Sequence, residues 1–415
     1  MKIVKLNSGQ FDNFASNHRY RNYYQTSQYA RVMTKFGYRS QFLGFVNEYN
    51  KLIGATLIIY KEAWRKYKIA YAPRGPLINY EDIEQLKQFV NALKEVLGKQ
   101  NFMLLRIDPC LPLSIRDEVG NVLNYNENGN DVIKNLKKVG FHYKGKNLYF
   151  ETEKPRWEAL VMLQRDPEEI FAKLDKKTRN KIRKAVNNGL VVVKDETKNI
   201  NKLFQYVGAK ERKPITFYKE MCQSFDSDID IYYAKIKTES YVINSRKNYE
   251  KEQEYNDQLA EKVQDLDLDP AERESYISKK MESDKLITAY KANLLKATEL
   301  LKQKPEGIFT AGAMVIKYDN AAYIYTEGFD DNYSALNASY LLKWQLISDY
   351  NEQGFKYINL NAVTGNFEET DPKKNPYIGL NEIKLGYNAT VTEYIGEFDI
   401  VLNHFAYNLY NKMNK

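Results

Sequence analysis

The stretch Glu239–Lys304, ESYVINSRKNYEKEQEYNDQLAEKVQDLDLDPAERESYISKKMESDKLITAYKANLLKATELLKQK, decides how the rest of this chain is organised. Its two halves show the apolar periodicity of helices and meet at the turn sequence Leu266-Asp267-Leu268-Asp269-Pro270. The flanking segments Ile229–Ile236 and Ile308–Ile316 are rich in β-branched and aromatic residues, which predicts strands. We therefore expect two antiparallel helices inserted into a β-sheet.

The two predicted helices have complementary patterns. In the second helix, apolar residues recur at alternating steps of three and four, as in a coiled-coil seam, at Ile287, Tyr290, Leu294, Ala297 and Leu301. The first helix offers the sparser set Tyr255, Leu259, Val263 and Leu266. Residues 239–271 carry 4 basic and 9 acidic side chains, whereas residues 272–304 carry 8 basic and 5 acidic side chains. The two helices therefore have opposite net charge. This favours an antiparallel coiled coil, which serves either as a docking arm for a large partner or as a solvated spacer.

Length and composition exclude several classes of protein. A chain of 415 residues is long enough for two or more domains with real cores. It contains no run of eighteen apolar residues and no signal-peptide pattern at its N-terminus, so we expect a cytoplasmic protein. The two cysteines, Cys110 and Cys222, are too few for a disulfide framework, and with three histidines a zinc site is not expected.

The charge of the chain is concentrated outside the predicted hairpin. The whole chain carries +8, and the hairpin holds 12 basic against 14 acidic residues, which leaves +10 for the remainder. A basic body suggests an anionic partner, such as nucleic acid, a phosphorylated substrate or an anionic membrane face.

The order of predicted elements occurs twice. The first half reads as Phe42–Val46 with Leu52–Tyr60 (strand hairpin), Ile83–Leu97 (helix), Met103–Ile107 (strand), Asn130–Val139 (helix) and Gly140–Tyr143. The second half reads as Ile229–Ile236 with Ile308–Tyr318 (strand hairpin), Ala338–Asn351 (helix), Tyr357–Asn361 (strand) and Leu385–Tyr387. Strands alternating with helices in two copies predict two α/β domains side by side.

The ends of the predicted strands are where we expect the functional site. Open α/β sheets bind ligands at such strand ends. We therefore expect a site near Arg74, Asp108, Tyr325 and Asn361 and in the region after Gly365, in a cleft between the copies.

Six motifs in a fixed order extend over nearly the whole chain. They are Ala-Pro-Arg-Gly-Pro (72–76), Arg-Ile-Asp-Pro (106–109), Lys-Pro-Arg-Trp (154–157), Thr-Arg-Asn-Lys-Ile-Arg-Lys-Ala (178–185), Ile-Lys-Leu-Gly-Tyr-Asn-Ala (383–389) and Tyr-Ile-Gly-Glu-Phe (394–398). Taken together, the chain resembles the Fem aminoacyltransferases of the FemA, FemB, FemX and MurM types. The resemblance implies an α/β (α+β) fold of two tandem acetyltransferase-like (GNAT) domains, with the antiparallel coiled-coil hairpin inserted in the second.

The resemblance also places the domain boundaries and names a reaction. The domains would be residues 1–153 and residues 154–238 with 305–400, with the hairpin at 239–304 and a C-terminal helix at 401–415. The reaction implied is transfer of an amino acid from aminoacyl-tRNA to the stem-peptide amine of a peptidoglycan precursor, either lipid II or UDP-MurNAc-pentapeptide. Aminoacyl-tRNA would be the donor, with no other cofactor.

This chemistry asks for positioning and a cation rather than a covalent nucleophile, because the ester is already activated. Lys384 matches the lysine that FemX-like enzymes use near the reacting carbonyl, and the preceding Ile383 stands where the family often has Phe. Asp108 matches the carboxylate of the Ile-Asp-Pro motif and would orient or deprotonate the incoming amine. The competing interpretations are an exposed strand end for Lys384 and a turn-capping role before Pro109 for Asp108.

The same resemblance names residues for the phosphates and sugar of the precursor. Guanidinium and ammonium groups are suitable ligands for a diphosphate. The implied residues are Arg31, Lys213, Phe217 and Tyr325, together with Arg74 from the strand-end argument. Phe217 stands where the family has Tyr, which removes a hydroxyl donor, and Tyr325 is equally compatible with a core aromatic.

A predicted helix at Glu168–Asn188 is strongly basic on one face. Seven of the twelve residues from Lys173 to Lys184 are Lys or Arg. The hypothesis is phosphate contact, with tRNA backbone or with anionic lipid, and a plain surface helix is an equal alternative. The residues expected to make this contact are Lys176, Lys177, Arg179, Lys181 and Arg183.

Two other functions compete with the aminoacyltransferase. An acyl-CoA-dependent GNAT enzyme would hold pyrophosphate on a Gly-rich loop before a helix, and neither half contains that loop. A catalytically inactive resistance, immunity or tRNA-binding protein would keep the same fold. The partners expected for the enzyme are aminoacyl-tRNA, the precursor and the inner leaflet of the membrane, and a homodimer remains an alternative to a monomer.

Overall fold

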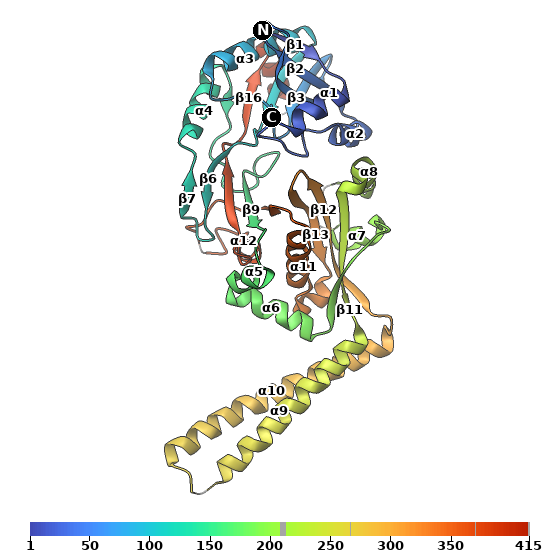
Figure 1. Ribbon diagram of the computed structural model, residues 1–415, viewed down its shortest axis with the longest axis vertical. Coiled ribbons are helices and arrows are strands. Elements are labelled where there is room, and N and C mark those ends of the chain that lie inside the picture. Colours follow the sequence, from blue (N-terminus) through green and yellow to red (C-terminus); the bar gives the residue numbers. More distant parts are fainter. Residues whose placement is uncertain (208–212, 266, 370, 414–415) are drawn as a thin grey trace.

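The computed structural model describes residues 1–207, 213–265, 267–369 and 371–413. Figure 1 shows two sheets with their helices, one above the other along the long axis, and a helical arm that extends from the lower end. The chain is a mixed α/β protein with two sheets, as the sequence predicts.

The first sheet has seven strands in the order β1-β2-β3-β4-β5-β16-β8. They are β1 (Lys2–Lys5), β2 (Arg39–Val46), β3 (Leu52–Trp64), β4 (Tyr67–Ala72), β5 (Phe102–Ile107), β16 (Phe398–Val401) and β8 (His142–Tyr143). Its neighbouring helices are α1 (Ser8–Ser16), α2 (Ser27–Lys35), α3 (Ile83–Lys99) and α4 (Glu127–Lys138). Strands β4 and β5 are parallel, and α3 connects them.

The second sheet has nine strands in the order β10-β11-β12-β13-β14-β9-β15-β6-β7. They are β10 (Leu190–Lys194), β11 (Ile229–Ile236), β12 (Ile308–Tyr318), β13 (Ala321–Phe329), β14 (Tyr357–Ala362), β9 (Trp157–Met162), β15 (Thr390–Tyr394), β6 (Pro112–Arg116) and β7 (Val122–Tyr125). Its helices are α5 (Pro167–Lys173), α6 (Lys176–Asn187), α7 (Ile200–Val207), α8 (Ile215–Phe225), α11 (Ala338–Glu352) and α12 (Ile378–Leu385). A last helix, α13 (His404–Met413), contacts β3 and β5 of the first sheet.

The predicted repeat of elements is present in both sheets. In each, antiparallel strands lead to one parallel pair, β4 with β5 and β13 with β14, joined by α3 and α11 respectively. Strands also cross between the predicted domains: β6 and β7 lie in the second sheet, and β16 lies in the first. These crossings tie the two halves together through backbone hydrogen bonds.

The inserted arm consists of α9 (Thr238–Gln264) and α10 (Pro270–Gln303), which lie against each other along their length (Figure 1). It joins adjacent ends of β11 and β12, where Ile236 pairs with Ile308. Leu259 and Ala297 are buried between the helices, whereas Leu266 lies outside the described residues. The prediction for Tyr255 is wrong: its side chain is 45% exposed, and the next residue, Asn256, is buried instead and donates to Asp284 over 2.8 Å.

The predicted single helix at 168–188 is in fact two helices. The chain leaves helical geometry at Leu174, whose ψ is 150°, and resumes at α6. Asp175 caps α6 by accepting a hydrogen bond from the backbone N–H of Thr178. The two helices stay in contact across the break, because Arg179 of α6 donates to the Ala172 carbonyl of α5.

Candidate functional site

Arg74 is the centre of a buried polar network between the two sheets. It follows β4 and is 2% exposed. Its Nη2 donates to Glu158 Oε1 over 2.5 Å and to the Pro155 carbonyl over 2.8 Å, and its guanidinium lies 4.3 Å from the centre of the Tyr394 ring. A buried guanidinium with this many partners joins the end of β4 to the start of β9.

Asp108, the predicted general base, lies at the end of β5 with its carboxylate already occupied. It accepts from the Arg74 backbone N–H over 2.6 Å and from the Tyr71 hydroxyl over 2.9 Å. Burial raises the pKa of Asp108 to about 6, and the nearby Arg74 opposes that rise. The structure thus places Asp108 where it holds Arg74 and joins the ends of β4 and β5.

Glu158 extends the network into the second sheet. Its Oε2 accepts from Asn359 Nδ2 over 2.7 Å and from the Tyr394 hydroxyl over 3.0 Å. Asn359 in turn binds the backbone N–H of Asn361, which adopts a left-handed conformation (φ 70°). Since Asn361 Nδ2 donates to the carbonyls of residues 324 and 325, this chain of contacts reaches the backbone of β13.

Lys384, the predicted catalytic cation, is buried and not on an exposed strand end. It lies on α12, is 6% exposed, and its Nζ donates to the Ala362 carbonyl at the end of β14 over 2.8 Å. Burial lowers the pKa of Lys384 to about 8, with Glu327 opposing the shift. Glu327 also pairs with the buried Lys343. The ammonium form of Lys384 is therefore only modestly favoured over the neutral amine near neutral pH. Such a lowered pKa is typical of functional lysines.

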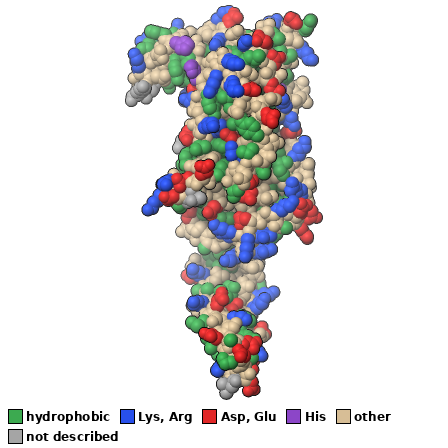
Figure 2. Space-filling view, turned by 90° about the vertical axis from the view of Figure 1, so that its left-hand side faces the viewer, with side chains coloured by type: hydrophobic (Ala, Val, Ile, Leu, Met, Phe, Trp, Pro, Cys, Tyr) green, Lys and Arg blue, Asp and Glu red, His purple; other side chains and the backbone are tan. Residues whose placement is uncertain are grey.

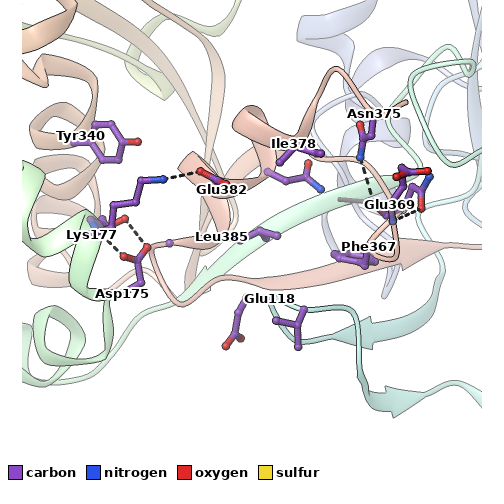
Figure 3. Close-up of a pocket in the computed structure, with 15 residues that line it drawn as sticks. Glu118, Asp175, Lys177, Tyr340, Phe367, Glu369, Asn375, Ile378, Glu382 and Leu385 are labelled. Carbon is purple, nitrogen blue, oxygen red and sulfur yellow. Dashed lines mark hydrogen bonds and ion pairs between the residues drawn. The ribbon is translucent and has the colours of Figure 1, made fainter. Parts of the chain in front are cut away.

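A cavity of about 540 Å³ lies beside α12. Figure 3 shows residues of α12, of the start of α6 and of the loop before α12 around it, with Lys177 paired to Glu382. Lys384 does not line it, since the lining face of α12 carries other residues. Its charged lining consists of Glu118, Asp175, Lys177, Glu369 and Glu382. Four carboxylates against one ammonium suit an amine-bearing ligand better than a phosphate.

Gly386 holds α12 against α6 at this cavity. A Cβ there would overlap the side chains of Asp175 and Thr178. The backbone N–H of Asp175 also donates to the Gly386 carbonyl over 3.0 Å. The Lys-Leu-Gly motif thus fixes α12, and with it Lys384, by close backbone contact.

The residues predicted for the precursor gather around α2 and α8. Arg31 is exposed on α2 and donates to the Ser224 carbonyl on α8 over 3.0 Å. Phe217 of α8 is buried, with the Lys213 ammonium 5.2 Å from its ring centre and the Tyr325 ring stacked 6.4 Å away. The structure therefore brings Lys213, Phe217 and Tyr325 together, whereas Arg31 contacts the same helix near its C-terminal end. Ile383 packs against the core of the second sheet.

The α6 side chains predicted to contact phosphate differ in whether they already bind other groups of the protein. Lys177 pairs with Glu382, Arg179 donates to the Ala172 carbonyl, and Lys181 donates to the Tyr340 hydroxyl. Lys176 and Arg183 are exposed, and the Arg183 guanidinium lies 5.5 Å from the Phe171 ring centre.

Sequence reasoning gave no role to Glu158 or to the two cations of the Lys-Pro-Arg-Trp motif near it. Lys154 places its ammonium 4.1 Å from the Tyr24 ring centre, and Arg156 is 1% exposed and paired with Glu393 over 2.9 Å. A signal was available, because Glu158 interrupts an otherwise apolar strand, WEALVM. An isolated carboxylate in such a strand needs a buried partner.

Within the described residues, no group of three His, Cys, Asp or Glu side chains is arranged to hold a metal ion. In the same part of the chain, no helix combines the length and the apolar character needed to cross a bilayer.

Comparisons with known proteins agree over the full chain. Residues 6–415 match the model of the FemAB family. The aminoacyltransferase FemA of Staphylococcus epidermidis is 23% identical over all of this chain and 99% of its own length. A lipid II:glycine glycyltransferase of the same species is 24% identical over all of this chain and 96% of its own length. The crystal structure of FemX has the same fold, with a TM-score of 0.72, 18% identity and 99% coverage of both chains.

Proposed function

Because this chain belongs to the FemAB family, a family of acyltransferases in which its relatives are named aminoacyltransferase and glycyltransferase, we propose that it transfers an amino acid from aminoacyl-tRNA to the stem-peptide amine of a peptidoglycan precursor. The acceptor is lipid II or UDP-MurNAc-pentapeptide, and the product is one step of the interpeptide bridge. Full-length similarity to the lipid II:glycine glycyltransferase supports the lipid-linked acceptor.

The reaction forms one bond and breaks one. The neutral amine attacks the ester carbonyl, and the C–N bond forms as the carbonyl oxygen takes on negative charge. The intermediate then expels the ribose oxygen of the tRNA, and the proton released by the amine goes to that oxygen. Aminoacyl-tRNA is the only co-reactant, so no further cofactor is proposed.

The observation that carries this proposal is the buried Lys384. A cation placed in a site from which water is excluded stabilises a developing oxyanion far more than one in water. Its ammonium is held at the end of β14, and burial keeps its pKa near 8, so it is still mostly protonated at neutral pH. Lys384 thus supplies the charge, while Asp108 and Arg74 position the elements around it.

The acidic cavity beside α12 is the proposed entry for the amine-bearing groups. Its four carboxylates attract the ammonium of the stem peptide or of the aminoacyl group. The precursor phosphates are assigned to Arg31, which lies on α2, and to Lys213, which lies just before α8. Lys176 and Lys177, at the start of α6, are next to the cavity and are assigned to phosphates at the acceptor end of tRNA.

The finer description of the fold belongs to the same proposal. We infer that the two sheets are two acetyltransferase-like units, because both lead from antiparallel strands to one parallel pair. We also infer that α9 and α10 form a coiled coil, in which Leu259 and Ala297 lie in the seam.

A transfer assay tests the proposal. The pure protein is supplied with a panel of charged tRNAs and with lipid-linked and nucleotide-linked precursors. Lys384→Ala should slow transfer at least about tenfold, a barrier change of roughly 1.4 kcal/mol. Lys373→Ala, at an exposed lysine in the loop before α12, is the control and should leave the rate unchanged.

Other outcomes would separate the competing functions. Transfer from acyl-CoA but not from aminoacyl-tRNA would show an N-acyltransferase of the same fold. No transfer from any donor would favour an inactive member of the family. Equal rates for Lys384→Ala and the unaltered chain would remove Lys384 from the mechanism.

A further inference from the structure

An open groove lies between α6 and α11, away from the acidic cavity. Two adjoining hollows of about 400 and 430 Å³ form it, and both are lined by Phe171, Arg183 and Trp344. Ile182, Val186 and Leu341 complete the apolar wall of the second hollow. We call this the α6–α11 groove.

Aromatic and aliphatic side chains form part of the groove wall although it opens to water, and Glu168, Arg179, Asn187 and Gln345 also line it. The Phe171 and Trp344 rings meet edge to face with their centres 4.9 Å apart, and neither ring is fully buried. Val186 is 50% exposed. Ile182 and Leu341 are buried, so the apolar surface that the groove offers to water comes from Val186 and the half-buried rings. Such a surface around an open hollow indicates a ligand or surface with apolar parts.

The α6 side of the groove is basic, whereas one carboxylate, Glu168 of α5, lines the first hollow. The helix α6 carries six Lys or Arg residues and no carboxylate. Figure 2 shows Lys and Arg side chains gathered on the lower part of the body, just above the arm, at the level where Figure 1 places α5 and α6. Arg183 and Lys184 are exposed next to the apolar wall. The partner therefore combines negative charge with apolar groups.

An anionic lipid surface meets both conditions, and RNA meets only the first. Tryptophan favours the boundary between headgroups and acyl chains, and Lys and Arg near a membrane attract anionic lipids. RNA has no alkyl chain to fill a hollow lined by Ile182, Val186 and Leu341.

We propose that the α6–α11 groove docks the protein on an anionic phospholipid bilayer. Val186 and Trp344 contact the acyl region, and Arg183 and Lys184 contact lipid phosphates. Docking here holds the end of the body that carries α12 at the membrane surface. The proposal does not depend on the transfer reaction, because binding to a bilayer needs neither donor nor acceptor.

Co-sedimentation with vesicles tests the proposal. The full chain should bind vesicles of phosphatidylcholine mixed with phosphatidylglycerol and should not bind phosphatidylcholine alone. Arg183→Glu with Lys184→Glu should weaken binding about tenfold or more, since each cation near the surface contributes separately. Val186→Asp should weaken binding as well, because it places a carboxylate in the apolar wall.

The matched control reverses another adjacent pair. Lys137→Glu with Lys138→Glu changes the net charge equally, in the last turn of α4. This variant should keep the vesicle binding of the unaltered chain. Trp emission should shift to the blue on anionic vesicles, and Trp344→Phe should remove that shift. Thermal unfolding of each variant separates loss of binding from loss of folding.

Three results would overturn the proposal. The first is no binding of the unaltered chain to anionic vesicles. The second is an equal loss in the α4 control, which would indicate net charge alone. The third is unchanged vesicle binding by the α6 variant together with lost retention of unacylated tRNA on a filter, which would make this surface an RNA site.

Discussion

The network around Arg74 and the arm formed by α9 and α10 are both rich in charge, but they place it in opposite environments. In the network, Arg74 is 2% exposed and Glu158 7%. In the arm, the ion pair between Lys280 and Asp284 has side chains 31% and 52% exposed. The difference shows that buried charged residues fix the relative positions of the strands they join. Exposed residues of the same types mainly make the surface of a helix compatible with water. Buried charges lose much when one partner is removed, whereas exposed pairs contribute little.

Removal of Glu158 should have the largest effect on stability. Glu158→Ala leaves the buried Arg74 guanidinium without its nearer carboxylate, with Asp108 4.0 Å away as the one that remains, and removes the acceptor for Asn359 and Tyr394. We expect a loss of about 3 to 5 kcal/mol in the free energy of unfolding, measured in urea. Glu169→Ala, which breaks the exposed pair with Lys173, is the control and should cost less than about 1 kcal/mol. Similar losses in the two variants would erase the contrast between buried and exposed charge.

The second prediction concerns Lys384 and pH. Burial lowers its pKa from 10.5 to about 8, so between these values the unfolded chain binds more protons than the folded chain at this residue. The free energy of unfolding therefore gains from this group as the pH rises from about 8 to about 10.5. Below pH 8 the buried charge costs stability in full.

Lys384→Met should lack that gain. The difference in the free energy of unfolding between the unaltered chain and the variant should change by up to roughly 3 kcal/mol across this range. Denaturation at about pH 7 and about pH 10 measures it. In parallel, transfer should fall in the unaltered chain as the pH rises through about 8, because the ammonium is lost. A stability difference independent of pH would mean that Lys384 is solvated.

The sequence predicted the repeated elements because local patterns encode them. The strands of both hairpins and the helices α3 and α11 follow from apolar periodicity and lie within a few residues of their expected bounds. The network around Arg74 could not be predicted in this way, because Glu158, Asn359 and Tyr394 come from distant strands that only the folded sheet brings together. The break at Leu174 was missed because Asp175 is a weak signal beside so many helix-forming residues.

The burial of Lys384 likewise could not be predicted from the local sequence. Its motif resembled a family site, but a lysine four residues after Leu380 on a short helix gives no local sign of burial. Burial arises because Gly386 packs α12 onto α6 and β14 supplies the Ala362 carbonyl. Chemistry-bearing residues could be named from the sequence, whereas their environments depended on contacts between remote segments.

The third prediction concerns a polar contact inside the arm. Asn256 is 7% exposed and donates to Asp284, which also pairs with Lys280. Asn256→Leu leaves that carboxylate half-exposed and still paired, so stability should change by no more than about 1 kcal/mol. Asn256→Asp should be worse at neutral pH and recover in acid, because two carboxylates would face each other. Urea denaturation at the two pH values measures both variants, and a large loss for the Leu variant would show that the arm depends on buried polarity as the body does.

The smallest loss in the free energy of unfolding should come from removing the exposed ion pair of the arm. Lys280→Ala removes an ion pair to Asp284 one helical turn away, with both distances 3.1 Å. Such pairs contribute about 0.3 to 0.5 kcal/mol, and salt screens them. The loss should therefore disappear when unfolding is measured at high salt, whereas the loss for Glu158→Ala should persist, because salt does not reach a buried pair. If salt left the Lys280→Ala loss unchanged, the pair would be shielded from solvent, and the arm would hold part of its charge in the way that the network around Arg74 does.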